Sequence, residues 1–431
     1  MVRLRPILLC AAIQAAAAGQ TAAPPLTLTL QDALTRARAN APQLLSANIA
    51  AQLAHEDRVQ AKAALLPAVT WAHQFIYTQP NGADTGVFIA ANGPREFGNQ
   101  AVVHADVFTP VKRAEYQRAA AAEAVARART DIALRGLYAT VVQNYYGLVV
   151  AERKFANARQ SQAEAQQFFD ITQKQERGGE AAHADVVKAQ IQLEQRQRDT
   201  QDARLGAERS RIGFAVLLFP DYRTDYTVAD DLAATPPLPP LDEVQTLAAR
   251  NNPDIRAAQQ TVEQETYGIK AAKNEYLPSL SLDYVYGLDA SQYRLHNPDG
   301  FHNVGSGVAA QMTIPVWTWG AIRSRVRQAE LRLQQARNDL TLAQRTLLAN
   351  LNSFYLEAQV ATSQLDSLRH SLDLSEQSLK LTLLRYQAGE ATALEVADAQ
   401  VTLIQARNAY DDGLARYRLG VANLQTLTGA F

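Results

Sequence analysis

The sequence predicts a mainly α-helical chain built as a tandem structural repeat, with four strands of a membrane β-sheet and long coiled-coil helices. Short motifs recur along the chain at an almost constant shift. Two long stretches, 111–219 and 316–431, contain no proline, and four short segments alternate apolar and polar side chains. Proline-free stretches permit unbroken helices, and a period of two indicates strands.

The duplication rests on four pairs of matching motifs, separated by shifts of 209 to 211 residues. The pairs are Asn40–Pro42 with Asn251–Pro253, Leu66–Pro67 with Leu277–Pro278, Val107–Thr109 with Val316–Thr318, and Gly179–Ala181 with Gly389–Ala391. One shift shared by four motifs indicates a tandem repeat. The chain therefore divides into a first repeat (26–219), a linker (220–240) that ends in the proline-rich segment 236–240, and a second repeat (241–431).

Each repeat is expected to contain an opening helix, two strands and a helical hairpin, in that order. The opening helices run from Leu30 to Leu65, interrupted near Pro42, and from Leu241 to Tyr276. The strands fall at 67–78, 97–109, 278–288 and 303–316, and the hairpin turns at 177–181 and 387–391. The third strand alternates most clearly, with Leu280, Leu282, Tyr284, Tyr286 and Leu288 on one face.

A coiled-coil seam is predicted in the second hairpin, because apolar residues there are spaced alternately by four and three. They are Ile322, Val326, Ala329, Leu333, Ala336, Leu340, Ala343 and Leu347. A helix from Ala321 to Tyr386 would be on the order of 100 Å long at 1.5 Å per residue. That length exceeds the diameter of an ordinary globular domain.

Residues 1–19 have the pattern of a secretory signal peptide: basic residues, a short apolar run and then small residues. The chain's one cysteine, Cys10, lies within this segment. Lipidation of Cys10 is the less favoured alternative, since Leu9 precedes it and the apolar run is short. A secreted chain without further cysteines needs no disulfide partner.

Composition excludes several classes of protein. The formal net charge is -1, which gives no electrostatic reason to bind nucleic acid. No stretch reaches the roughly 18 consecutive apolar residues of a transmembrane helix. Catalytic motifs, cofactor motifs and metal-ligand spacings are absent as well, so we expect neither an enzyme nor a metal protein.

Four membrane strands cannot close a barrel, because the smallest membrane barrels use about eight. An open edge in lipid would leave backbone groups unpaired, so the chain is expected to oligomerise. The alternative is a periplasmic structural or adaptor-like coiled-coil protein whose small sheet lies outside the membrane.

The sequence resembles the TolC-like outer-membrane efflux proteins from Leu26 to Gly429. The resemblance rests on the Asn-x-Pro helices, the Leu-Pro strand entries, the strand-exit motif Pro315–Gly320 followed by Arg325, Gln328 and Ala329, and the paired Gly-Glu-Ala turns. It implies a homotrimer with a 12-stranded barrel in outer-membrane lipid and a 12-helix periplasmic tunnel. The implied function is the exit duct of an efflux or secretion system, working with a periplasmic adaptor and an inner-membrane transporter.

The two hairpin turns are candidate docking sites. Each glycine suits the left-handed conformation that ends a helix, and the resemblance implies that Gly179, Glu180, Gly389 and Glu390 form the tip that contacts the adaptor. A plain helical turn is the simpler interpretation of both motifs.

Glu395 and Asp398 are candidate gate residues, because a spacing of three places them on one helix face. In a trimer they would form stacked carboxylate rings whose repulsion raises some pKa values and favours cations. A solvated helix face is the alternative. The resemblance further implies that Tyr386 and Asp185 occupy positions of a hydrogen bond that closes the tunnel, although Ala391 stands at a position of that network where it can donate no bond.

Overall fold

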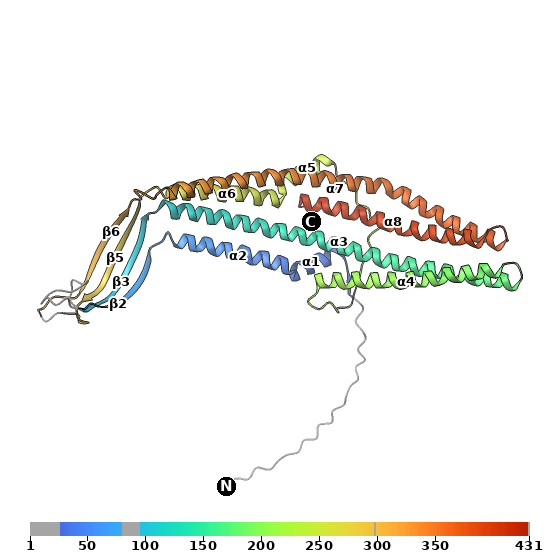
Figure 1. Cartoon of the computed structure of the whole chain (residues 1–431), viewed down its shortest axis with the longest axis horizontal. Coiled ribbons are helices and arrows are strands. Elements are labelled where there is room, and N and C mark those ends of the chain that lie inside the picture. Colours follow the sequence, from blue (N-terminus) through green and yellow to red (C-terminus); the bar gives the residue numbers. More distant parts are fainter. Residues whose placement is uncertain (1–25, 80–94, 297–298, 430–431) are drawn as a thin grey trace, which may run out of the picture.

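The computed structural model describes residues 26–79, 95–296 and 299–429 of the chain; the expected signal peptide lies outside them. The described part is elongated, with a β-sheet at one end and the turns of two helical hairpins at the other (Figure 1). The same order of elements occurs twice. None of the described helices combines the length and apolarity needed to cross a bilayer.

The opening helix of each repeat is broken into two at the Asn-x-Pro motif, giving α1 (Leu30–Asn40) and α2 (Pro42–Ala63), then α5 (Leu241–Asn251) and α6 (Pro253–Asn274). Proline suits the first helical position because its missing N–H would be unpaired there anyway. The side chain of Asn252 caps α6 by accepting from the backbone N–H groups of Asp254 and Ile255, at 2.9 and 3.2 Å. The opening helix thus ends before the proline and a new helix begins at it, and in the second repeat the new helix has its own N-cap.

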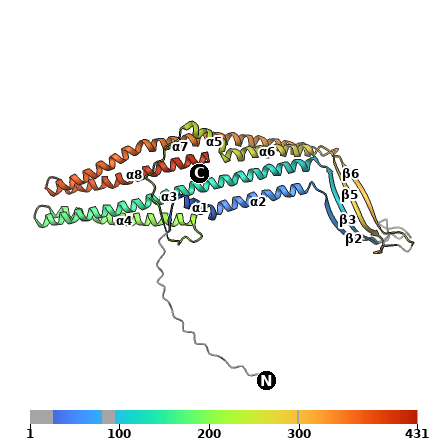
Figure 2. The ribbon, with the colours of Figure 1, turned by 180° about the vertical axis from the view of Figure 1, so that it is seen from behind.

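The long helices are α3 (Pro110–Arg177), α4 (His183–Leu218), α7 (Ala321–Gln387) and α8 (Ala393–Thr428). They pair as the hairpins α3–α4 and α7–α8, which lie side by side when seen from either direction (Figure 2). All eight residues of the predicted seam in α7 are buried or partly buried. The coiled-coil prediction for this helix is therefore confirmed.

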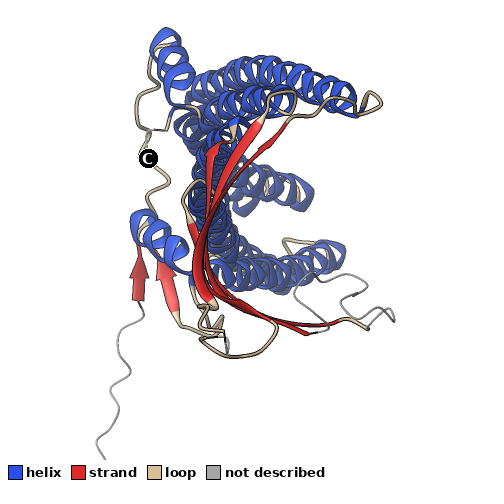
Figure 3. Cartoon of the chain, turned by 90° about the vertical axis from the view of Figure 1, so that its left-hand side faces the viewer, coloured by secondary structure: helices blue, strands red, loops and turns tan. Residues whose placement is uncertain are grey.

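The sheet contains β2 (Ala68–Tyr77), β3 (Arg95–Phe108), β5 (Ser279–Ala290) and β6 (Val304–Thr313), antiparallel and in the order β2-β3-β5-β6. It is strongly curved (Figure 3). The two repeats meet in its middle, where β3 pairs with β5. Within the described residues, β2 and β6 each lack a partner on their outer side.

The register gives the sheet one apolar and one polar face, because residues directly opposite in an antiparallel pair share a face. One row of the apolar face is Val69, Val103, Tyr284 and Val308. On the other face, Nδ1 of His104 and Oδ1 of Asp283 form a hydrogen bond at 2.6 Å. A bulge between Asp106 and Phe108 brings Phe108 beside Leu280, so β3 keeps an apolar residue on the apolar face at its end.

The linker between the repeats contains an element that the sequence did not predict. Its residues Tyr226–Val228 form β4, which pairs in parallel with β1 (Leu26–Leu28). The hydroxyl of Tyr145 donates to the carbonyl of Ala229 at 2.5 Å, and Arg153 binds both carboxylate oxygens of Asp230 at 2.6 and 2.9 Å. The linker is therefore fixed against α3 around the middle of the helical body.

Gly287 is required by close packing where the two repeats join. A Cβ at this position would lie 2.6 Å from Cα of Gln100 and closer still to the carbonyl oxygen of Asn99, both backbone atoms of β3. We predict that Gly287→Ala lowers the free energy of unfolding by about 1 to 3 kcal/mol through strain. Denaturant titration in detergent would measure it. Gly307→Ala is the matched control in β6, because its Cβ would meet no atom within 4 Å; equal effects would refute the packing argument.

Candidate gate and docking tip

The two hairpin turns have the same hydrogen-bonded geometry. Gly179 and Gly389 have φ angles of 78° and 75°, the left-handed region that glycine adopts without strain. The N–H of Glu180 donates to the carbonyl of Gln175 at 2.8 Å, and that of Glu390 donates to the carbonyl of Arg385 at 2.8 Å. These bonds close a Schellman motif at the end of α3 and of α7. The left-handed turns predicted from the glycines are thus confirmed.

The helices that follow the turns begin differently. Thr392 caps α8 with a capping box, in which its hydroxyl accepts from the N–H of Glu395 at 3.3 Å and Oε1 of Glu395 accepts from the N–H of Thr392 at 3.1 Å. At the equivalent position of α4, Ala182 provides no side-chain cap. The second repeat therefore has the more firmly fixed tip.

Glu395 is held by contacts within its own chain. The backbone N–H and the hydroxyl of Thr392 bind its carboxylate, and with the nearby guanidinium of Arg385 they lower its pKa. Arg385 approaches Oε2 of Glu395 to 3.5 Å and also donates to the carbonyl of Glu390 at 3.0 Å. Within one chain the pKa of Glu395 is therefore lowered, whereas a ring of carboxylates was expected to raise it. The pKa falls because hydrogen bonds to the charged form outweigh desolvation at this exposed site.

Asp398 lies one helical turn beyond Glu395, and both side chains are exposed. Their spacing places them on one face of α8, so the structure keeps the two carboxylates together. Ala391, which interrupts the implied closing network, is partly buried in the turn before α8 and packs against the apolar cluster that contains Tyr386. No group of three or more His, Cys, Asp or Glu residues suited to a metal occurs within 26–79, 95–296 and 299–429.

Tyr386 ties the second hairpin to the first. Its ring is buried against Phe168, with the ring centroids 5.1 Å apart, and its hydroxyl donates to Oγ1 of Thr172 at 3.2 Å. Burial raises the pKa of Tyr386. Asp185, the partner position implied by the resemblance, instead pairs with Lys188 at 3.6 Å. Within the chain, the hydroxyl of Tyr386 therefore bonds to α3 and not to α4.

A polar seam between α3 and α8, missed by the sequence analysis, continues from the tip toward the middle of the chain. Arg407 is buried, with guanidinium nitrogens 3.1 Å from Glu164 and 3.5 Å from Glu376. Asp411, also buried, accepts from Arg153 and Asn157 at 2.9 Å each. The sequence signal for this seam is the pair of opposite charges Arg407 and Asp411, four residues apart on α8 and flanked by the apolar residues Leu403 and Leu414.

A duplicated strand pair and hairpin, assembled as one curved sheet on a long helical body, is the architecture of an outer-membrane channel protein. The chain belongs to the outer membrane efflux protein family, whose model matches residues 33–218 and 244–430.

Two relatives cover most of the chain. The alkaline protease secretion protein AprF of Pseudomonas aeruginosa is 21% identical over 413 residues, which span 93% of this chain and 84% of AprF. The outer membrane protein TolC of Vibrio cholerae is 22% identical over 404 residues, spanning 93% of this chain and 90% of TolC.

Solved structures share the fold. The CmeC outer membrane channel of Campylobacter jejuni superposes with a TM-score of 0.82 at 17% identity, over 93% of this chain and 85% of CmeC. The outer membrane protein VceC of Vibrio cholerae superposes with a TM-score of 0.80 at 16% identity, over 93% of this chain and 96% of VceC.

The capping box predicts how the tip responds to substitution of Thr392. Thr392→Ala removes the hydroxyl from the N-cap, which costs about 1 kcal/mol, so the first turn of α8 should open about five times more often. Amide hydrogen exchange of residues 392–396 would detect it. The pKa of Glu395 should rise toward its ordinary value, only in part, because the backbone N–H of residue 392 remains.

Thr402→Ala is the control on the same helix, since among the described residues the hydroxyl of Thr402 bonds only the carbonyl of Asp398 in the preceding turn. Unchanged exchange in Thr392→Ala would show that the cap does not hold this turn.

Proposed function

We propose that the chain is one third of a homotrimeric exit duct in the outer membrane, through which an efflux or secretion system passes its cargo to the exterior. The observation that carries the proposal is a curved sheet with two free edges, on a helical body that also has two free apolar edges.

The sheet edges require partners. In lipid, each unpaired backbone group on β2 or β6 would cost several kcal/mol, and four strands are too few to close alone. Pairing β6 of one copy with β2 of the next repeats the antiparallel arrangement of the sheet. Three copies would give the 12 strands that the family resemblance implies.

The helical body has complementary edges. Exposed apolar side chains follow α2 and α4 along one side and α7 along the other, and Figure 1 places these helices on opposite sides of the body. Those on α2 are Leu45, Ile49, Leu53 and Val59; those on α4 include Val187 and Ile191; those on α7 include Leu342, Leu348, Leu356, Leu374 and Leu381. Two different edges that bury each other form a head-to-tail contact, which closes into a ring.

The two faces of the sheet suit a water-filled barrel. The apolar face, with Trp71, Tyr284 and Val308 exposed, would meet lipid, and the polar face with His104 and Asp283 would line the passage. A periplasmic coiled-coil protein, the alternative function, would have no use for an exposed apolar sheet face of this extent.

At the other end, the turns containing Gly179, Glu180, Gly389 and Glu390 would contact a periplasmic adaptor, which links the duct to an inner-membrane transporter. Tyr386, with its bond to Thr172, would hold the two hairpins together at the tip, and the nearby carboxylate of Asp185 would add negative charge to the gate. Glu395 and Asp398 would form rings of negative charge at the constriction. Support for these roles comes from the family and from the position of all eight residues at the free end of the hairpins.

Trimer formation and conduction test the proposal directly. Chemical cross-linking in mild detergent should give a largest species of three chains, and the purified protein should conduct ions in planar bilayers. The protein should stay with outer membranes after a carbonate wash. A monomer released by carbonate and without conductance would support the periplasmic coiled-coil alternative.

The gate prediction uses neutral isosteres, because alanine at Glu395 would also remove the helix cap. Glu395→Gln with Asp398→Asn should weaken cation preference and block by multivalent cations, since the negative rings are lost while the cap remains. Single-channel recording would measure both. Asp339→Asn, an exposed carboxylate on α7 far from the tip, is the control.

Tyr386→Phe provides the contrasting variant. It removes the hydroxyl that donates to Thr172, a bond worth about 1 kcal/mol, and should raise conductance without changing ion preference. If the double variant conducts and blocks like the unaltered protein, the two carboxylates are a solvated helix face.

A further inference from the structure

The connection between β6 and α7 exposes two tryptophans at the junction of sheet and helices. Trp317 is 73% exposed and Trp319 is 89% exposed, the highest value among the large hydrophobic residues described. Their rings contact each other edge to face, with centroids 5.6 Å apart. Apolar side chains this exposed indicate a surface that is covered by something outside the chain.

The backbone at Trp319 is strained. Its φ is 50°, and no other residue except glycine has a positive φ in the described part of the chain. The N–H of Ala321 donates to the carbonyl of Thr318 at 2.9 Å, which closes a turn whose central residues are Trp319 and Gly320, with φ of 50° and 82°. Glycine would adopt this turn without strain, whereas a bulky residue is disfavoured there.

The first repeat has no such feature. Its equivalent motif, Val107–Thr109, leads directly into α3 at Pro110 without a left-handed residue. The second repeat therefore keeps a large aromatic side chain at a position where its conformation is unfavourable and where its ring is almost fully exposed. A strained residue of this kind points to a role outside the folding of the chain itself.

The tryptophans continue the apolar face of the sheet toward the helices. Phe108, Leu280 and Met312 lie opposite one another in the last apolar row, and Ile314 follows two residues later, 57% exposed. The face thus ends in aromatic rings where the strands give way to helices. Trp is enriched at this level of a membrane protein because its ring is apolar and its indole N–H needs a polar partner.

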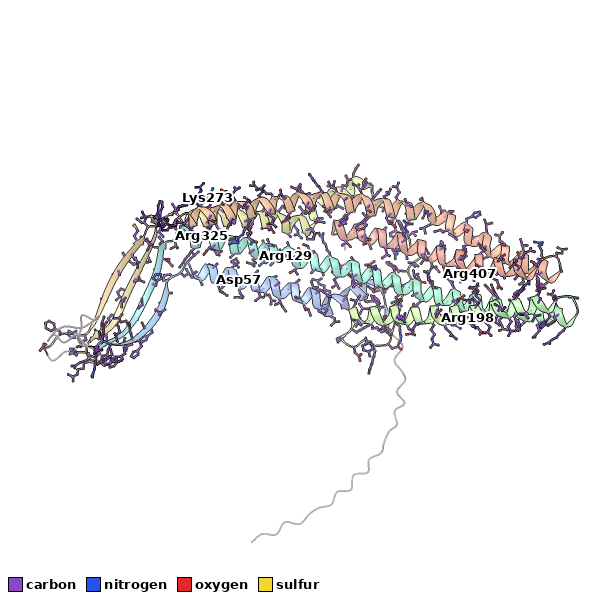
Figure 4. All side chains as sticks on the ribbon, viewed as in Figure 1. Asp57, Arg129, Arg198, Lys273, Arg325 and Arg407 are labelled. Atoms are coloured by element: carbon purple, nitrogen blue, oxygen red, sulfur yellow. The ribbon has the colours of Figure 1, made fainter. Side chains whose placement is uncertain are left out.

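Positive charge lies immediately beyond the rings. Lys273 at the end of α6 and Arg323 in the first turn of α7 are exposed, and neither forms an ion pair within the described residues. Arg325 is neutralised by Glu275, with Nη2 and Oε2 at 2.5 Å. Lys273 and Arg325 mark this junction in Figure 4. Free cations beside an aromatic band match the phosphates of a lipid headgroup layer.

We propose that Trp317 and Trp319 insert into the phospholipid headgroup layer on the periplasmic side of the outer membrane, and that Trp319 fixes the depth of the sheet in the bilayer. Lys273 and Arg323 bind the lipid phosphates. The inference rests on the proposed function, which puts the sheet in lipid. The competing occupant is the next subunit, whose Leu66, 60% exposed just before β2, would come near this connection on ring closure.

Depth-dependent fluorescence quenching separates these possibilities. The chain has three tryptophans, at positions 71, 317 and 319, so Trp71→Phe with Trp317→Phe leaves Trp319 as the one emitter. In liposomes, a nitroxide on the phospholipid headgroup should quench Trp319 several-fold more than a nitroxide in the middle of the acyl chain. Trp71, isolated by Trp317→Phe with Trp319→Phe, is the control on the apolar face and should be quenched more by the acyl-chain label.

Each result decides between the hypotheses. Quenching of Trp71 but not of Trp319 would overturn this inference, because another subunit then covers Trp319, while the membrane sheet stands. Quenching of neither would mean that the sheet is not in lipid, and the proposed function would fail. If the variant with Trp71→Phe and Trp317→Phe does not fold, a nitroxide label attached to Trp319→Cys reports on the same position. Its collision rates with oxygen and with a water-soluble nickel complex should both be intermediate at the headgroup level, and both low if a subunit covers it.

Discussion

The constraint on which the rest of this structure depends is that a β-sheet in lipid cannot end in an unpaired strand. Each N–H or C=O left open on β2 or β6 would have no water to bind. The described sheet has four strands, so in the proposed trimer it would be completed as part of a shared barrel. The helices would then follow the threefold symmetry of that trimer, because α2 and α7 continue from the two sides of the sheet and expose apolar residues there.

Inside one chain, the two hairpins are joined by a different chemistry. At the tip, Phe168 packs against Tyr386, but farther along, α3 and α8 meet through Arg407, Asp411 and their partners. A buried ion pair adds little net stability, because desolvation offsets the attraction, yet it is costly to separate. The seam therefore mainly fixes how α8 is aligned along α3 and α7, because Arg407 forms its ion pairs only where Glu164 and Glu376 lie beside it.

Sequence reasoning succeeded where the signal was local. The seam of α7 follows from apolar spacing, and the left-handed turns follow from Gly179 and Gly389. It could not reach contacts made across the fold. Tyr386 meets Thr172 from 214 residues away, and β1 and β4 are three-residue strands, too short for a period of two to be read. The strained backbone of Trp319 could not be predicted either, because the spacing of residues in a sequence does not determine a φ angle.

Glu395 shows how a local contact can support a role in the assembly. Repulsion within a ring of carboxylates raises their pKa values. If the carboxylates become protonated, the ring loses its negative charge and no longer attracts cations. Here the N–H and hydroxyl of Thr392 stabilise the charged form of Glu395 before any neighbouring subunit is considered. The same hydrogen bonds begin α8 and hold the residue at the start of the helix. In the proposed trimer, the cap would oppose the rise in pKa caused by the other carboxylates, so the charge at the constriction and the start of α8 would depend on one threonine.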